Sequence, residues 1–172
     1  CVYGVGLWLP SALKSLGSSS NILIGFLSAV PYLAAATAMV IVGAHSDHTL
    51  ERRWHVALAA FIGAAALVGA GYSGVIGLSV AGFGIALAAS FSMAGPFWAM
   101  VSATLSAETA AGGIALINAL GNLGGGFGPY WVGYLRGITG SFRGGLLSVA
   151  LFMTISGFTI LLLSRGSSAR TS

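Results

Sequence analysis

Long apolar stretches separated by short polar segments dominate the chain. No charged residue occurs between Val56 and Ala107, nor between Ala110 and Leu135. A bilayer core of ~30 Å needs about 20 apolar residues in a helix, so stretches of this length predict membrane-spanning segments. Their continuous apolarity, without ten-residue alternation of polar and apolar positions, favours helices over barrel strands. The pattern therefore predicts an all-α membrane protein.

The breaks in the pattern predict one partial span and five complete spans. Segment 56–107 has no ionisable side chain except the Tyr72 phenol, and as one straight helix it would be ~78 Å long. It must therefore turn back, and the glycine-rich segment 69–74 is the best hinge. The apolar start of the chain is too short to cross, so we interpret it as the end of a span whose beginning is missing. The expected spans are 1–13 (partial), 21–43, 55–71, 75–101, 110–135 and 144–164, with Asn21 capping the second and a polar tail at 165–172.

One polar segment, 43–55, collects most of the charge. It contains Asp47, Glu51, Arg52 and Arg53 together with His45, His48 and His55. A charged side chain at the bilayer centre costs at least ~2.5–3.5 kcal/mol on insertion scales. The sequence therefore predicts that 43–55 is a surface loop between two spans. Glu108 and the small residues around it predict another surface loop.

Composition supports the membrane assignment, since 56% of residues are apolar and only 6% are charged, against about 25% in soluble proteins. The net charge of +4 comes from scattered basic residues, so no nucleic-acid surface is expected. Counting Lys and Arg on the two sides slightly favours a cytoplasmic position for the 43–55 loop. Its side holds Arg52, Arg53, Arg165 and Arg170, whereas the opposite side holds Lys14, Arg136 and Arg143.

Catalytic and metal sites are not expected. Residues 71–74 match the Gly-x-Ser-Gly signature of rhomboid proteases, but no histidine follows His55, so Ser73 lacks the base that would activate it. His45 and His48 could share one helical turn and hold a metal, yet no third ligand is evident, which favours a solvated pair. We therefore predict neither an enzyme nor a cofactor.

The uncharged span 110–135 carries two asparagines. At 100° per residue, Asn118 and Asn122 share a stripe about 60° wide with Gly125 and Pro129. Carboxamides in hydrocarbon need partners, so both are predicted to face the bundle interior or a wet cavity. The alternative is that they only hydrogen-bond to neighbouring helices. The residues expected to permit close helix packing are Gly121, Gly124, Gly125, Gly128 and Pro129.

The preceding span contains Gly95-Pro96-Phe97-Trp98. A proline there kinks the helix, which in transporters often marks a substrate region but also occurs with packing alone. Nearby hydroxyl groups could add hydrogen-bond donors or bond only to their own backbone. These are Ser90, Ser92, Ser102 and Thr104.

Two of these segments resemble a known family. Segment 43–55 resembles the loop between the eighth and ninth helices of major facilitator superfamily transporters, although His48 and Leu50 stand where that family usually has a basic residue and a glycine. Residues 113–130, preceded by 95–98, are similar to helices ten and eleven of the anion:cation symporter branch. That branch includes bacterial carriers for tartrate, phthalate, hydroxyphenylacetate and sugar acids. The resemblance covers nearly the whole chain.

The resemblance implies the C-terminal six-helix half of a twelve-helix fold, with its first helix truncated. It implies a multi-pass inner-membrane protein in which the 43–55 loop and the C-terminus are cytoplasmic. It further implies symport of a small organic anion with a coupling cation, namely a proton, by alternating access against the N-terminal half. Since this half has no charged residue in mid-span, the coupling acid and the substrate-binding cation would lie in the other half.

Residue roles follow from the same resemblance. Substrate binding is expected at Asn118, Asn122, Trp98 and Ser102, and gating at Gly43, Asp47, Arg52 and Arg53, with Asp47 near a helix N-terminus. Two alternatives stay open. One is a six-span structural or channel protein that acts as a homo-oligomer, and the other is a facilitator-family carrier of neutral solutes.

Overall fold

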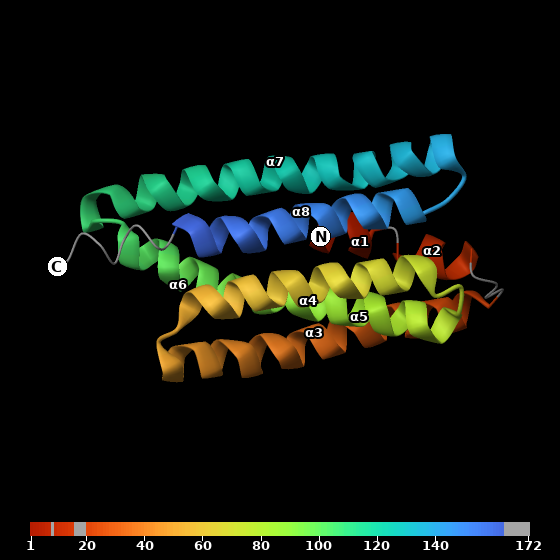
Figure 1. Ribbon diagram of the computed structural model, residues 1–172, viewed down its shortest axis with the longest axis horizontal. Coiled ribbons are helices and arrows are strands. Elements are labelled where there is room, and N and C mark those ends of the chain that lie inside the picture. Colours follow the sequence, from red (N-terminus) through yellow and green to blue (C-terminus); the bar gives the residue numbers. More distant parts are fainter. Residues whose placement is uncertain (8, 16–19, 164–172) are drawn as a thin grey trace.

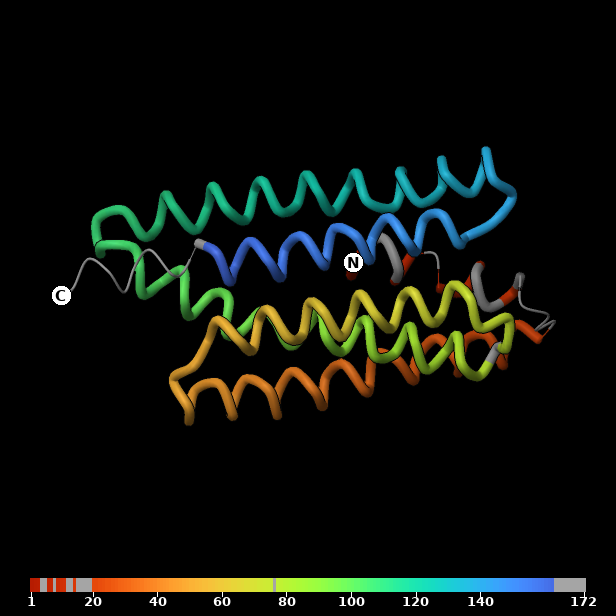
Figure 2. The backbone as a smooth tube through the Cα atoms, in the orientation of Figure 1, coloured from red at the N-terminus to blue at the C-terminus, as the bar shows by residue number. Residues whose placement is uncertain are grey.

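The computed structural model describes residues 1–7, 9–15 and 20–163, and this part of the chain is helical without any strand. Long helices run side by side, with two short helices at the N-terminal end (Figures 1 and 2). The predicted tail at 165–172 lies outside the described residues. The helices are α1 (Val2–Gly6), α2 (Leu9–Ser15), α3 (Asn21–Thr49), α4 (Arg52–Tyr72), α5 (Ile76–Ser92), α6 (Ala94–Thr104), α7 (Ala107–Thr139) and α8 (Arg143–Leu163).

Four helical stretches are long and apolar enough to cross a membrane. They are 21–49, 52–72, 77–104 and 143–162. The all-α membrane fold predicted from the sequence is thereby confirmed. Helix α7 has 33 residues and is long enough to cross, but it is not among the four, because glycines and asparagines interrupt its apolar residues.

The prediction of a long loop at 43–55 is wrong. Helix α3 continues to Thr49 and α4 begins at Arg52, so only Leu50 and Glu51 connect them. Leu50 closes the turn in the left-handed conformation with φ 56°. The charged and histidine side chains therefore lie at the ends of these two helices. A helix can continue beyond the apolar core of a membrane when its polar side chains reach water.

Two smaller expectations about helix ends also need correction. Ser20, and not Asn21, caps α3, since its hydroxyl accepts a hydrogen bond from the Leu23 N–H at 3.4 Å. The loop expected around Glu108 is shorter and ends before it, because α7 starts at Ala107 and places Glu108 in its first turn. A carboxylate there is favoured by the positive end of the helix dipole.

The turn expected within 69–74 occurs at its end, because α4 continues to Tyr72 and Gly74 adopts the left-handed conformation at φ 60° before α5 begins. The following stretch is interrupted at Met93, which separates α5 from α6. Pro96 has no N–H to donate to the carbonyl of Ser92 four residues earlier, which explains an irregularity at this point.

The core lies around α4, which packs extensively against α5 and α8, while α3 packs against α5. Small side chains on α4 permit this close packing, since Ala57, Ala60 and Ala64 are buried. Helix α7 contributes only Val132 to this core and touches mainly α1 and α8 (Figure 1). This arrangement leaves the polar helix α7 at the edge of the bundle.

Candidate functional site

The two asparagines of α7 lie on an exposed face of that helix. The Asn122 Nδ2 group donates a hydrogen bond to the Asn118 Oδ1 atom at 3.2 Å, and both residues are exposed. Among the described residues, the pair therefore bonds to itself and not to a neighbouring helix. A carboxamide offers two N–H donors and an acceptor oxygen, so one shared bond leaves most of the pair's hydrogen-bonding capacity for a ligand or water.

Helix α7 as a whole is poorly covered by the described residues. Its only buried side chain in the core is Val132. Large apolar side chains are exposed around it, namely Leu116, Leu120, Leu123, Phe127, Tyr130 and Tyr134. Lipid can cover such apolar residues, but it cannot satisfy carboxamides. The asparagine face therefore needs a polar cavity or another protein segment beside it.

The α7 glycines differ in what they face. A Cβ atom at Gly125 would lie 2.7 Å from the Tyr3 ring of α1, so this glycine allows α1 to approach closely. At Gly121 and Gly124, a Cβ atom would meet nothing within 4 Å. Gly128 and Pro129 are half-buried. Close helix packing at the predicted glycine stripe is thus seen at Gly125, whereas Gly121 and Gly124 border open space.

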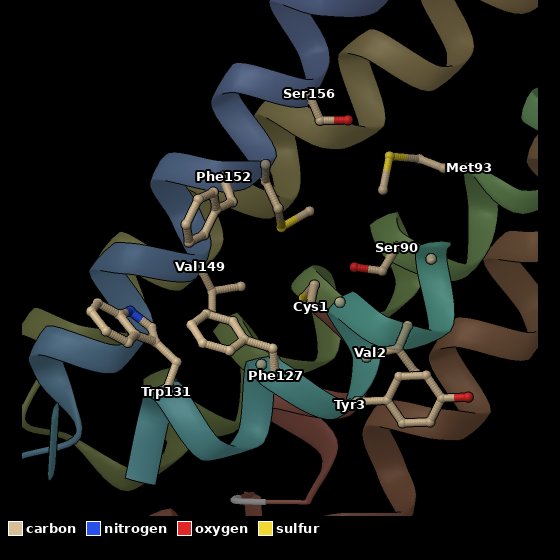
Figure 3. A pocket seen from close by; sticks show the side chains of 15 residues that line it. Cys1, Val2, Tyr3, Ser90, Met93, Phe127, Trp131, Val149, Phe152 and Ser156 are labelled. Atoms are coloured by element: carbon tan, nitrogen blue, oxygen red, sulfur yellow. The ribbon is translucent and has the colours of Figure 1, made fainter. Parts of the chain in front are cut away.

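That open space includes a cavity of about 510 Å³ between α1, α5, α7 and α8. Figure 3 shows the rings of Phe127, Trp131 and Phe152 on one side of it, with Ser90 and Met93 across from them. The Ser90 hydroxyl already donates to the Ala86 carbonyl oxygen at 2.7 Å. The cavity is mostly apolar and offers few free polar groups.

The four predicted substrate residues lie outside the 510 Å³ cavity. None of Asn118, Asn122, Trp98 and Ser102 lines it. Trp98 is half-buried on α6 and packs edge-to-face against Phe97 with ring centroids 5.4 Å apart, whereas Ser102 is exposed. The asparagine pair is thus the strongest candidate for ligand contact.

The predicted gating residues gather at the α3–α4 turn. Asp47 lies in the last turn of α3, because α3 extends beyond it. Its carboxylate pairs with Arg52 in the first turn of α4 at 3.4 Å. Arg53 donates to the Leu161 carbonyl oxygen of α8 at 3.0 Å. Gly43 is half-buried inside α3, and a Cβ atom there would meet nothing within 4 Å.

A histidine pair at the same turn was not predicted. His45 Nδ1 lies 2.7 Å from His55 Nε2, so His45 pairs with His55 and not with His48. The other His55 nitrogen bonds to the Glu51 carbonyl oxygen, which requires a proton on that nitrogen. When His55 is neutral, its Nε2 atom accepts the hydrogen bond from the His45 Nδ1–H group. Among the described residues, no group of three or more potential metal ligands occurs. Only the short turn between α3 and α4 brings residues 45 and 55 together.

The two arginines of this turn are expected to differ in their effect on stability. The Asp47 side chain is 72% exposed, so Arg52→Gln should cost less than ~1 kcal/mol. Arg53→Gln should cost more, about 1–3 kcal/mol, because it removes the hydrogen bond that Arg53 donates to the Leu161 carbonyl oxygen of α8. Thermal unfolding of the complete protein in detergent measures both. Equal losses for the two variants would contradict this assignment.

Comparison with known proteins identifies relatives over nearly the whole chain. A putative tartrate transporter of Agrobacterium vitis is 42% identical over 171 residues, which is 96% of this chain and 37% of the relative. A quinolone resistance transporter of Acinetobacter baumannii is 35% identical over 88% of this chain and 35% of its own length. The putative metabolite transport protein NicT of Pseudomonas putida is 32% identical over 94% of this chain and 37% of its length.

These relatives are named as transport proteins and not as enzymes, which agrees with the sequence-based prediction. The tartrate transporters fit the resemblance found in the motifs. No family model matches the chain. The chain spans about 37% of the length of the curated relatives it matches, a proportion consistent with half of a transporter.

Proposed function

We propose that this chain, a homologue of bacterial major facilitator superfamily transporters, forms the C-terminal six-helix half of a twelve-helix carrier. The carrier moves a small organic anion across the inner membrane together with a cation, a proton in the simplest case. It alternates access by rocking this half against the N-terminal half, with the substrate near the membrane midplane between them.

The exposed asparagine pair on α7 is the observation that carries this proposal. Asn118 and Asn122 lie near the middle of a 33-residue helix, on a face that no described residue covers. In a carrier, that face borders the substrate path and the opposite half. The carboxamide N–H groups then donate hydrogen bonds to the oxygens of the substrate.

The charge distribution supports different roles for the two halves in binding the substrate and the coupling cation. The acidic residues Asp47, Glu51 and Glu108 all lie at helix ends, and no Lys or Arg lies in the middle of a described long helix. This half therefore supplies neutral hydrogen bonds. The cation that pairs with a substrate carboxylate, and the acid that carries a coupling proton, belong to the other half.

The α3–α4 turn has the features of a conformational latch on the cytoplasmic side. The Asp47–Arg52 pair joins α3 to α4, and Arg53 joins α4 to α8. An exposed ion pair is worth only ~0–1 kcal/mol. Such a weak link can break and re-form during each transport cycle without trapping either state.

The test is counterflow with the complete carrier in proteoliposomes. Vesicles loaded with unlabelled tartrate should accumulate labelled tartrate, whereas vesicles loaded with a sugar or a neutral amino acid should not. An inward proton gradient should raise uptake of the anion. Counterflow with neutral solutes but not with tartrate would replace the organic-anion assignment with the neutral-solute alternative. Transport by residues 1–172 alone would contradict the two-half carrier.

A further inference from the structure

A second cavity, of about 310 Å³, lies where the α4–α5 and α7–α8 turns meet. Both turns are at the same end of the bundle (Figure 1). Two arginines, Arg136 and Arg143, line this cavity together with the hydroxyl-bearing residues Ser79 and Ser141. It is the more polar of the two cavities, and none of the predicted substrate or gating residues contributes to it.

Each arginine is held by an aromatic ring. The Arg143 guanidinium carbon lies 4.8 Å from the centroid of the Tyr72 ring, and its Nε–H donates to the Gly71 carbonyl oxygen at 3.0 Å. The Arg136 guanidinium carbon lies 4.3 Å from the centroid of the Phe142 ring. Both guanidinium groups therefore make cation–π contacts with neighbouring aromatic rings. The Nε bond of Arg143 uses one of its five N–H donors and still leaves the terminal nitrogens able to reach a ligand.

The electrostatic setting of the cavity favours an anion. All three carboxylates of the chain, Asp47, Glu51 and Glu108, lie at the α3–α4 and α6–α7 turns, at the opposite end of the bundle (Figure 1). Helices of about 20 residues separate the two ends by ~30 Å, well beyond the Debye length of ~8–10 Å. The cavity end therefore carries a net positive charge.

The start of α8 affects Arg143 directly, whereas α4 and α7 end at the same cavity with the opposite dipole sign. Arg143 is the first residue of α8, so its cation lies at the positive end of a 21-residue helix, which the helix dipole disfavours. Ser141 accepts a hydrogen bond from the Arg143 backbone N–H at 3.1 Å and caps the same end. An anion bound here would be attracted both by the Arg143 cation and by the positive end of α8, and it would offset the repulsion between them.

We propose that this cavity binds one oxyanion group, a phosphate or a carboxylate, between Arg136 and Arg143. Guanidinium groups match such groups because their N–H donors form paired hydrogen bonds with two oxygens. The site lies at a bundle end, where helices leave the apolar core. The anion is therefore either the headgroup of an anionic phospholipid or a soluble anion from the adjacent water. This inference does not depend on the transport cycle proposed above.

The experiment uses the complete carrier, delipidated in neutral detergent at fixed ionic strength. Its thermal midpoint is measured against inorganic phosphate in one arm and against phosphatidylglycerol in mixed micelles in the other, with phosphatidylcholine and sodium chloride as references. The variants are Arg136→Gln and Arg143→Gln. The matched control is Lys14→Gln, which removes one exposed cation outside the cavity.

We expect a saturable rise of the midpoint for the wild type, with half-saturation shifted at least ~10-fold in either arginine variant and unchanged in Lys14→Gln. A rise with both probes identifies a soluble anion, and a rise with phosphatidylglycerol alone identifies a lipid headgroup. If a glutamine variant does not fold, Arg143→Lys keeps the charge but loses the Nε bond, and it should bind several-fold more weakly. The site is overturned if neither probe exceeds its reference, or if Lys14→Gln loses the effect as fully as the arginine variants.

Discussion

Replacing Asn118 with Ala in the complete carrier should raise the KM for tartrate by ~10-fold or more, because a hydrogen bond to a charged acceptor is worth about 1.5–3 kcal/mol. The same result is expected for Asn122→Ala. Each residue is exposed, and neither contacts the described core, so protein yield and thermal stability should change little. Uptake kinetics in proteoliposomes, at equal amounts of reconstituted protein, measure the effect.

The two asparagines should also act together. Since Asn122 donates to Asn118 at 3.2 Å, removing either side chain frees its neighbour from a fixed orientation. The double variant should therefore lose less affinity than the two single losses added together. Leu120→Ala is the matched control, because Leu120 is 59% exposed on the opposite side of the same helix. Unchanged kinetics in both asparagine variants, or equal loss in the leucine control, would remove the pair from the substrate path.

The asparagine face illustrates what the sequence could predict. The 3.6-residue period alone placed Asn118 and Asn122 on one stripe, and the spacing of apolar stretches predicted where the chain crosses and turns. Both inferences use local geometry, which a sequence carries directly. The turn at Gly74 was predictable for the same reason, because a glycine-rich segment had to interrupt an apolar run too long for one helix.

The sequence-based predictions failed where the position of a residue depends on tertiary structure. Charge in 43–55 correctly indicated contact with water, but water also surrounds helix ends, so the inference of a long loop did not follow. The His45–His55 pair depends on a two-residue turn that no periodicity indicates. Likewise, Arg136 and Arg143 looked like ordinary turn residues, because their shared cavity requires the α4–α5 turn to lie beside them.

The largest effect on folding is expected at Gly82, where α5 crosses α4. A Cβ atom there would lie 2.8 Å from the Ala66 carbonyl oxygen, 2.8 Å from the Ala70 Cβ atom and 3.3 Å from the Ala70 Cα atom. Two of these three atoms belong to the backbone of α4, so no side-chain rotation can relieve the clash. Gly82→Ala must therefore push α5 away from the C-terminal part of α4.

We expect Gly82→Ala to destabilise the complete carrier by about 1–3 kcal/mol, which exceeds the ~0.5–1 kcal/mol that alanine gains over glycine in a helix. Gly77→Ala is the matched control on the same helix, since its Cβ atom would meet nothing within 4 Å, and it should be neutral or slightly stabilising. Thermal unfolding in detergent compares the two. A Gly82 variant as stable as the Gly77 variant would mean that α4 and α5 do not approach this closely, and the core that supports α7 through α8 would need a different packing.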